Sequence, residues 1–261
     1  MSVGKVLLQQ DNEGVATIIL NRPDVHNAFD DEVIADLRKK LDQLADDDET
    51  RVVIITARGK SFSAGADVEW MKRAAGFSEE ENFADARNLG CLLYRLNSLP
   101  LPTIALIQGP TFGGGVGLVA ACDIAVAVKS ATFAFSEVRL GLTPATISPY
   151  VISAIGTRHA RRYFITGETF DADAALRMGL VHIVVTDAGE MHAARDRLLR
   201  SIREAAPKAA RAAKDLVAAV RARPVDDAMI EDTALRIATR RASAEGIEGI
   251  SAFLDKRKPE W

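Results

Sequence analysis

The chain has 261 residues and a formal net charge of −3, and apolar residues make up 48% of it. This length suits one large domain, or one domain with an appendage, and the apolar share is enough for a substantial core. The acidic balance argues against a general nucleic-acid binder, although it leaves room for a local basic patch.

The cysteines and the N-terminus bear on the compartment. Cys91 and Cys122 have no metal-ligand spacing and cannot form a disulfide framework, which favours a reducing cytoplasm. Met1 to Gln10 shows no basic segment followed by an apolar run, so we expect no signal peptide. The apolar stretch from Phe112 to Cys122 is glycine-rich and too short to span a bilayer, which predicts a buried segment.

The first part of the chain alternates predicted strands and helices. Short β-branched runs predict strands, and apolar residues at helical spacing between charges predict amphipathic helices. The continuous apolar strands indicate burial on both faces, and therefore an α/β core. The predicted strands are 15–20, 52–56, 103–107, 124–128 and 132–135, and the predicted helices are 30–44, 80–96, 158–165 and 172–178, the last capped by Gly179.

From Ala188 onward the composition shifts to alanine, arginine and leucine, and the strand signals vanish. Helices are predicted at 190–205, 209–220, 226–242 and 245–256. We therefore divide the chain into an α/β core over 1–187 and a helical region over 188–261, which suggests a packing or assembly element.

Two glycine-rich turns, each following a β-like run, are the most informative feature. The first spans 61–67 (Ser-Phe-Ser-Ala-Gly-Ala-Asp), and the second spans 108–117 and contains Gly113, Gly114 and Gly115. Glycine permits close approach of the backbone, so each turn can aim bare N–H groups at one point. Two donors from separate turns would form an oxyanion hole. The alternative is that the glycines only permit tight packing and that Asp67 caps a helix running through Met71.

The next candidate is Glu137, which lies among largely apolar neighbours in 135–141. Burial there would raise its pKa and would call for a partner or a catalytic role. The alternative is an exposed ion pair between Glu137 and Arg139, and Arg139 could instead pair with a charged substrate group. The serines have no paired histidine and acid, and the four histidines share no metal-like spacing, so we predict neither a serine nucleophile nor a metal site.

Together these motifs resemble the enoyl-CoA hydratase/isomerase, or crotonase, superfamily over essentially the whole chain. The resemblance is carried by 20–23 with 27–29, and by 62–67, 113–124, 135–144 and 252–257. Within the superfamily the chain is most similar to bacterial methylglutaconyl-CoA hydratases and the related carboxygeranoyl-CoA hydratases. That finer likeness is carried by 67–72, 136–150 and 256–261.

The resemblance implies a crotonase-like spiral of ββα turns and a C-terminal helical region used in trimers, which often pair into hexamers. It implies that the N–H groups of Ala66 and Gly114 form the oxyanion hole and that Glu137 moves the proton. The residues implied to contact the CoA thioester are Ala64, Ala66, Asp67, Val68 and Arg139, with Phe253 and Lys256 reaching the CoA of a neighbouring subunit. No separate cofactor is expected, because coenzyme A is part of the substrate.

One departure from the family pattern concerns the number of acids. Typical two-glutamate hydratases have a glutamate where this chain has Gly117, so only the acid matching Glu137 is present. The leading hypothesis is reversible hydration of a branched, carboxylated enoyl-CoA, with Lys72, Arg73 or Arg139 near the distal carboxylate. The alternatives are an enoyl-CoA isomerase that uses Glu137 alone, and a non-catalytic RNA-binding or assembly protein.

Overall fold

The computed structural model describes residues 4–261, so the first three residues of the predicted core and of the N-terminal stretch lie outside it. The described chain forms a six-stranded sheet in the order β1-β2-β3-β4-β6-β9 and a three-stranded sheet in the order β5-β7-β8. The strands are β1 Val6–Gln10, β2 Val15–Leu20, β3 Val52–Ala57, β4 Thr103–Ile107, β5 Thr111–Phe112, β6 Ile124–Val128, β7 Thr132–Ala134, β8 Phe170–Asp171 and β9 Ile183–Val185.

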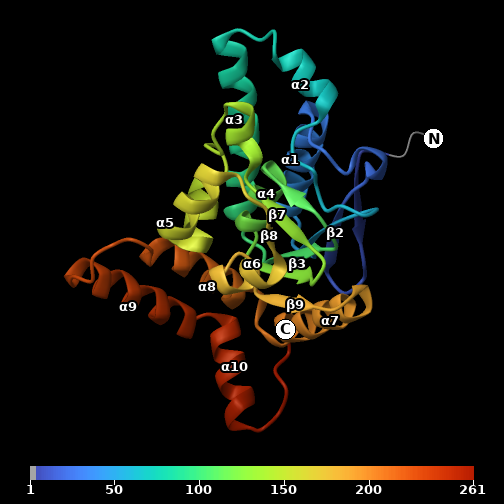
Figure 1. The fold of residues 1–261 in the computed structure, drawn as a ribbon. Coiled ribbons are helices and arrows are strands. Elements are labelled where there is room, and N and C mark those ends of the chain that lie inside the picture. The colour runs from blue at the N-terminus through green and yellow to red at the C-terminus, as the bar shows by residue number, and fades with distance from the viewer. Residues whose placement is uncertain (1–3) are drawn as a thin grey trace.

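The helices alternate with these strands in the first part of the chain and stand alone after β9 (Figure 1). They are α1 Asp31–Ala45, α2 Val68–Ala74, α3 Glu79–Asn97, α4 Gly114–Ala121, α5 Ser148–Thr166, α6 Ala172–Met178, α7 Ala188–Glu204, α8 Pro207–Val220, α9 Asp227–Arg241 and α10 Ala244–Leu254, with short 3-10 helices η1 Pro23–Val25 and η2 Ser136–Leu140. The α/β class predicted from the apolar strands is therefore confirmed.

The chain winds as a spiral between the two sheets. Strands β2, β3, β4, β6 and β9 pair in parallel, while β1 is an antiparallel edge strand. After β4 and β6 the chain enters the small sheet as β5 and β7, which also pair in parallel. A single bridge between Ser63 and Thr111 aligns the segment after β3 with β5 in the same way. Each turn of the spiral thus holds one long strand and one short β segment, followed by a helix.

The structure differs from the predicted elements in one helix and in several short or edge strands. The predicted helix 158–165 is the second half of α5, which starts at Ser148 and bends at Gly156, where φ is 73°. Strands β1, β5, β8 and β9 have no counterpart among the predicted strands. Strand β9 has only three residues, and it gains stability by pairing with β6 across a long sequence separation, which no local pattern reveals.

The helical region does not behave as one unit. Helix α7 packs against β6 and β9 and buries Met191, Ala194 and Leu199. Helices α9 and α10 instead lie outside the layered body, at the lower left and bottom of Figure 1. None of the helices within residues 4–261 combines the length and apolar character needed to cross a bilayer.

Candidate active site

The two glycine-rich turns come together because they follow adjacent parallel strands, whose carboxyl ends lie at the same edge of the sheet. Their backbones touch directly. A Cβ placed on Gly65 would lie 3.4 Å from the carbonyl oxygen of Phe112, and one placed on Gly115 would lie 2.8 Å from Cβ of Ser63. Gly65 has φ of +91° and Gly113 has φ of +49°, a region that favours glycine. Glycine is therefore required here for both close approach and conformation.

Each turn presents at least one backbone donor that the described chain does not use. Among the hydrogen bonds of residues 4–261, neither the N–H of Ala66 nor that of Gly114 has a partner. Gly114 is the first residue of α4, where an N–H has no acceptor within the helix and where the positive end of the helix dipole lies. Two unpaired N–H groups on touching turns are the arrangement that an oxyanion hole needs.

Phe29 contacts both turns. Its N–H donates to the carbonyl oxygen of Gly65 at 2.7 Å, and its own carbonyl oxygen accepts from the N–H of Asp67 at 2.8 Å. These two bonds bracket Ala66 and leave its N–H free. The Phe29 ring packs beside Gly114, where a Cβ would lie 3.3 Å from ring atom Cδ2. Phe29 therefore ties the position of one free N–H to that of the other.

Glu137 reaches this point from the small sheet. It lies in η2, directly after β7, and β7 pairs with β5 in the register Phe112 to Ala134. The N–H of Gly113 donates to the carbonyl oxygen of Ala134 at 3.0 Å. As a result, Oε1 of Glu137 lies 3.1 Å from the point where a Cβ on Gly113 would stand. A buried Phe135 ring, packed edge-on against Phe164 at 4.9 Å, anchors the segment on the other side.

The carboxylate of Glu137 is half-buried and unpaired. Its Oε2 is inaccessible and has no hydrogen-bond partner within residues 4–261. Burial raises the pKa of Glu137 above its usual value of 4.5. No ion pair joins Glu137 to Arg139 in the described chain, so the alternative of an exposed surface couple is wrong. An unpaired carboxyl group with a raised pKa, beside two free N–H donors, is suited to proton transfer.

The residues after Ala66 have structural partners of their own. Asp67 caps α2 by accepting from the N–H groups of Glu69 and Trp70, so the alternative that it is a helix cap holds. Its carboxylate also pairs with Arg22 at 2.8 Å. Burial by itself would raise the pKa of Asp67, but the bonds from Trp70 and Arg22 outweigh burial and lower it. Val68 is exposed at the start of α2, and Ala64 is half-buried. Their contacts with CoA stay predictions.

The three cations considered for substrate recognition differ in their partners. Lys72 pairs with Glu69 at 2.6 Å, and Arg73 pairs with Asp31 at 2.8 Å. Arg139 is exposed and has no ion pair within residues 4–261. Its Nε lies 3.3 Å from the point where a Cβ on Gly167 would stand, so its stem rests on the end of α5.

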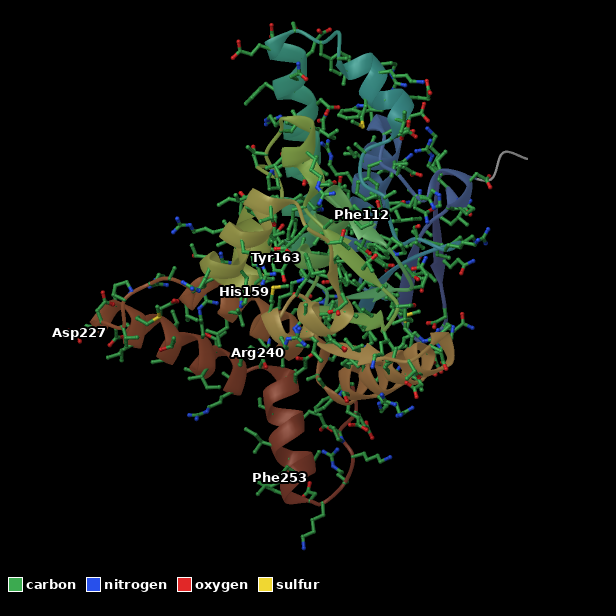
Figure 2. All side chains as sticks on the ribbon, in the orientation of Figure 1. Phe112, His159, Tyr163, Asp227, Arg240 and Phe253 are labelled. Atoms are coloured by element: carbon green, nitrogen blue, oxygen red, sulfur yellow. The ribbon has the colours of Figure 1, made fainter. Side chains whose placement is uncertain are left out.

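The C-terminal residues of the prediction lie on the outlying helices. Phe253, on α10, is 83% exposed, and Figure 2 shows it near the bottom of the molecule, far from Phe112 of the second turn. Lys256 follows α10 in a left-handed conformation with φ of 55°. Neither belongs to the site within one chain, and their contact with a neighbouring subunit stays a prediction.

The place of the missing second acid is filled. Gly117 is buried in α4, and a Cβ there would lie 2.9 Å from Cβ of Ile147 and 3.4 Å from Cδ1 of Leu93. Ile147 is itself only 2% exposed. A glutamate at 117 would need both side chains to move, so the chain carries apolar packing where the resemblance to two-glutamate hydratases implies a carboxylate.

Sequence reasoning about the site missed Phe29 and Arg22 as structural partners of the residues beside Ala66. Both residues lie within the segments that carried the family resemblance. No local pattern shows that Phe29 brackets Ala66, because its bonds to Gly65 and Asp67 join parts of the chain that are far apart in sequence.

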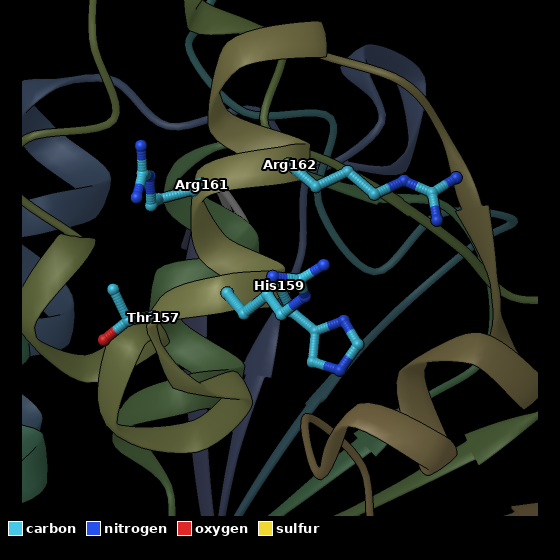
Figure 3. A pocket seen from close by; sticks show the side chains of 5 residues that line it. Thr157, His159, Arg161 and Arg162 are labelled. Carbon is cyan, nitrogen blue, oxygen red and sulfur yellow. The ribbon is translucent and has the colours of Figure 1, made fainter.

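Other candidate binding features of the surface are separate from these residues. A cavity on α5 is lined by Thr157, Arg158, His159, Arg161 and Arg162, none of which belongs to the two turns or to η2 (Figure 3). Residues 4–261 contain no group of three His, Cys, Asp or Glu side chains arranged to hold a metal ion. Both cysteines are free, and burial raises the pKa of Cys122 to about 12.

Comparison with known proteins shows the family to which the chain belongs. Residues 10–261 match the family model described as enoyl-CoA hydratase/isomerase. A solved structure from Legionella pneumophila, assigned as an enoyl CoA hydratase/isomerase (crotonase), is 43% identical, with a TM-score of 0.93 and coverage of 99% of both chains. An enoyl-CoA hydratase structure from Shewanella pealeana is 39% identical, with a TM-score of 0.95, covering 100% of this chain and 97% of that one.

A curated relative extends the match to a named activity. The short-chain-enoyl-CoA hydratase of Clostridium acetobutylicum is 30% identical over 266 residues, which cover 100% of this chain and 98% of the relative. A family match over nearly the whole chain, full-length relatives and a shared fold lead to one conclusion. The chain is an enzyme of the enoyl-CoA hydratase/isomerase family, within the crotonase superfamily.

Proposed function

We propose that this enzyme adds water reversibly to the double bond of an α,β-unsaturated acyl-CoA thioester. The observation that carries the proposal is the position of the Glu137 carboxyl group, beside Gly113 and next to the two free N–H groups of Ala66 and Gly114. The thioester oxygen would accept hydrogen bonds from these two donors. Each such donor contributes about 3–4 kcal/mol to lowering a barrier of this kind.

In the proposed reaction Glu137 takes a proton from water while the water oxygen bonds to the β-carbon. The electron pair of the double bond moves toward the thioester, and the two N–H donors stabilise the enolate. A proton then reaches the α-carbon. We propose that Glu137 returns the proton that it took, with water as the alternative source; the apolar packing at Gly117 supports this assignment. Such a cycle leaves the enzyme unchanged and adds one water.

The proposed substrate is a branched, carboxylated enoyl-CoA such as methylglutaconyl-CoA. A distal carboxylate favours a nearby cation, and Arg139 is the one of the three candidate cations that has no ion pair within residues 4–261. A turnover screen over straight-chain, methyl-branched and carboxylated enoyl-CoA thioesters tests this proposal. Preference for a straight-chain substrate over the carboxylated ones would contradict it.

An enoyl-CoA isomerase is the second candidate, favoured by one observation. Moving a proton between two carbons needs only one acid, and the packing of Gly117 against Ile147 leaves Glu137 as that acid. Reaction in water enriched in heavy oxygen separates the two activities. The label enters a hydratase product, and an isomerase product without label would replace the first proposal with the second.

We also propose that copies of the chain assemble as a trimer or a pair of trimers. The proposal is supported by apolar side chains that α9 and α10 expose to solvent. They are Ile230, Leu235, Ile237, Ile247, Ile250, Phe253 and Leu254. Burying such side chains against a second copy would remove apolar surface from water. Light scattering should give a mass three or six times the 28.2 kDa of one chain. A monomer mass would contradict the proposal.

A further inference from the structure

Arg22 contacts both residues that flank Phe29, the backbone of Ala28 and the side chain of Asp30. Its Nη1 donates to the carbonyl oxygen of Ala28 at 2.7 Å and lies 3.3 Å from the carboxylate of Asp30. Its Nη2 lies 2.8 Å from the carboxylate of Asp67. Ala28 and Asp30 flank Phe29 in sequence, and Asp67 follows Ala66. One guanidinium therefore joins the two segments that meet at the bridge between Phe29 and Ala66.

Asn27 links the backbone of Arg22 to the first turn. The N–H of Arg22 donates to Oδ1 of Asn27 at 2.8 Å. Asn27 is buried in a left-handed conformation, with φ of 55°, and its amide donates to the carbonyl oxygens of Arg58 and Ser61, each at 2.8 Å. Arg22 is thus linked through Asn27 to Ser61, at the start of the turn 61–67, and it pairs directly with Asp67 at the end of that turn.

This matters for the direction of one N–H group. The residue before Ala66 is Gly65, whose φ of +91° is not restrained by a Cβ. Local backbone preferences therefore do little to fix the peptide plane that carries the N–H of Ala66. Its direction depends on the hydrogen bonds of its neighbours to Phe29 and on the ion pair that holds Asp67.

We propose that Arg22 is a positioning residue for the oxyanion donor Ala66, an inference that rests on the proposed function of that site. Removal of one oxyanion donor lowers kcat about 10²–10³-fold in known enzymes. Displacing the donor should cost less, so Arg22→Met is expected to lower kcat about 10-fold or more and to change KM about twofold or less. Arg22→Lys should recover only part of kcat, because an ammonium lacks the planar fork that reaches three acceptors.

The experiment measures the carbonyl stretch of bound butyryl-CoA labelled with ¹³C at the thioester carbon. Hydrogen bonds from the site lower this frequency relative to the free thioester. Lys5→Gln is the matched control, because Lys5 pairs with Asp30 at 2.6 Å but makes no contact with Asp67 or Ala28. Asp67→Asn, an isosteric change, tests the same contact from the other side should Arg22→Met unfold.

The expected result is a lowered frequency in the wild type and in Lys5→Gln, and a return toward the free value in Arg22→Met and Asp67→Asn. A full shift in both of these variants, with unchanged kcat, would overturn the role of Arg22. The role of Arg22 would also be overturned if Lys5→Gln lost as much of the frequency shift and of kcat as Arg22→Met. If the wild type shows no shift, the proposed oxyanion hole fails, and the role of Arg22 fails with it.

Discussion

Ile147 lies against Gly117 so closely that a Cβ on the glycine would stand 2.9 Å from Cβ of the isoleucine. The contact decides two properties at once. It lets α4 and the start of α5 pack without a gap, and it fills the position at which the family resemblance implies a second carboxylate in two-glutamate hydratases. A glutamate could therefore occupy position 117 only if this packing changed.

Gly117→Ala is expected to destabilise the protein by about 1–3 kcal/mol, because extra volume in a filled core forces neighbours to move. Gly90→Ala, on α3, is the matched control. A Cβ there would lie 3.6 Å from Thr146, an ordinary contact, and alanine favours the helix by up to about 1 kcal/mol. Urea unfolding of both variants measures the difference. Equal stability of the two would contradict the packing argument.

Adding Ile147→Ala to Gly117→Ala extends this test to the pair. The smaller side chain should remove the overlap, so the two changes should not be additive in a double-mutant cycle. Additive losses would show that the strain at Gly117 comes from elsewhere.

Glu137→Gln should abolish hydration while leaving binding of the CoA thioester largely intact. The amide keeps the shape of the side chain but cannot take a proton from water. Single-turnover kinetics measures the chemical step, and calorimetric titration with a saturated acyl-CoA measures binding. Full activity in the variant would remove Glu137 from the mechanism.

The raised pKa of Glu137 also predicts a pH dependence. The base must be ionised, so kcat/KM should fall as pH decreases through a value above the usual 4.5. The free energy of unfolding should change in the opposite direction, decreasing as pH rises. The folded state binds the proton more tightly than the unfolded state, so the carboxyl group destabilises the fold as pH rises through that window. Glu137→Gln should therefore melt higher than the wild type at pH 7. The gap should close below pH 4.5, and melting curves at both pH values check this.

Arg139→Gln tests the recognition of a distal carboxylate. Loss of a charge-assisted hydrogen bond costs about 1.5–3 kcal/mol, so KM for a carboxylated enoyl-CoA should rise about 10-fold to 100-fold. KM for an uncharged enoyl-CoA of similar size should not change. Lys72→Gln is the control, because Lys72 already pairs with Glu69 on the surface. Equal effects on both substrates would assign Arg139 a structural role beside Gly167.

Local sequence patterns predicted many of the strands and helices of this protein and its two glycine-rich turns. Strand β3 follows from a continuous run of β-branched residues, and helix α3 follows from apolar residues at helical spacing. The turns after β3 and β4 follow from their glycines, two of which have the positive φ that other residues rarely adopt. Glu137 stood out because a carboxyl group among apolar residues needs a reason to be there. These features are local, because they depend on backbone preferences and on which side chains water excludes.

Tertiary structure alone decided how these parts act together. The resemblance named the N–H groups of Ala66 and Gly114, but only the folded structure showed that both lack an acceptor within residues 4–261 and that their turns touch. Arg22 and Ile147 look ordinary in the sequence. One joins segments separated by 45 residues, and the other fills a space defined by two helices. Hydrogen bonding and close packing depend on the distance between atoms, and residues far apart in the chain acquire that distance only on folding.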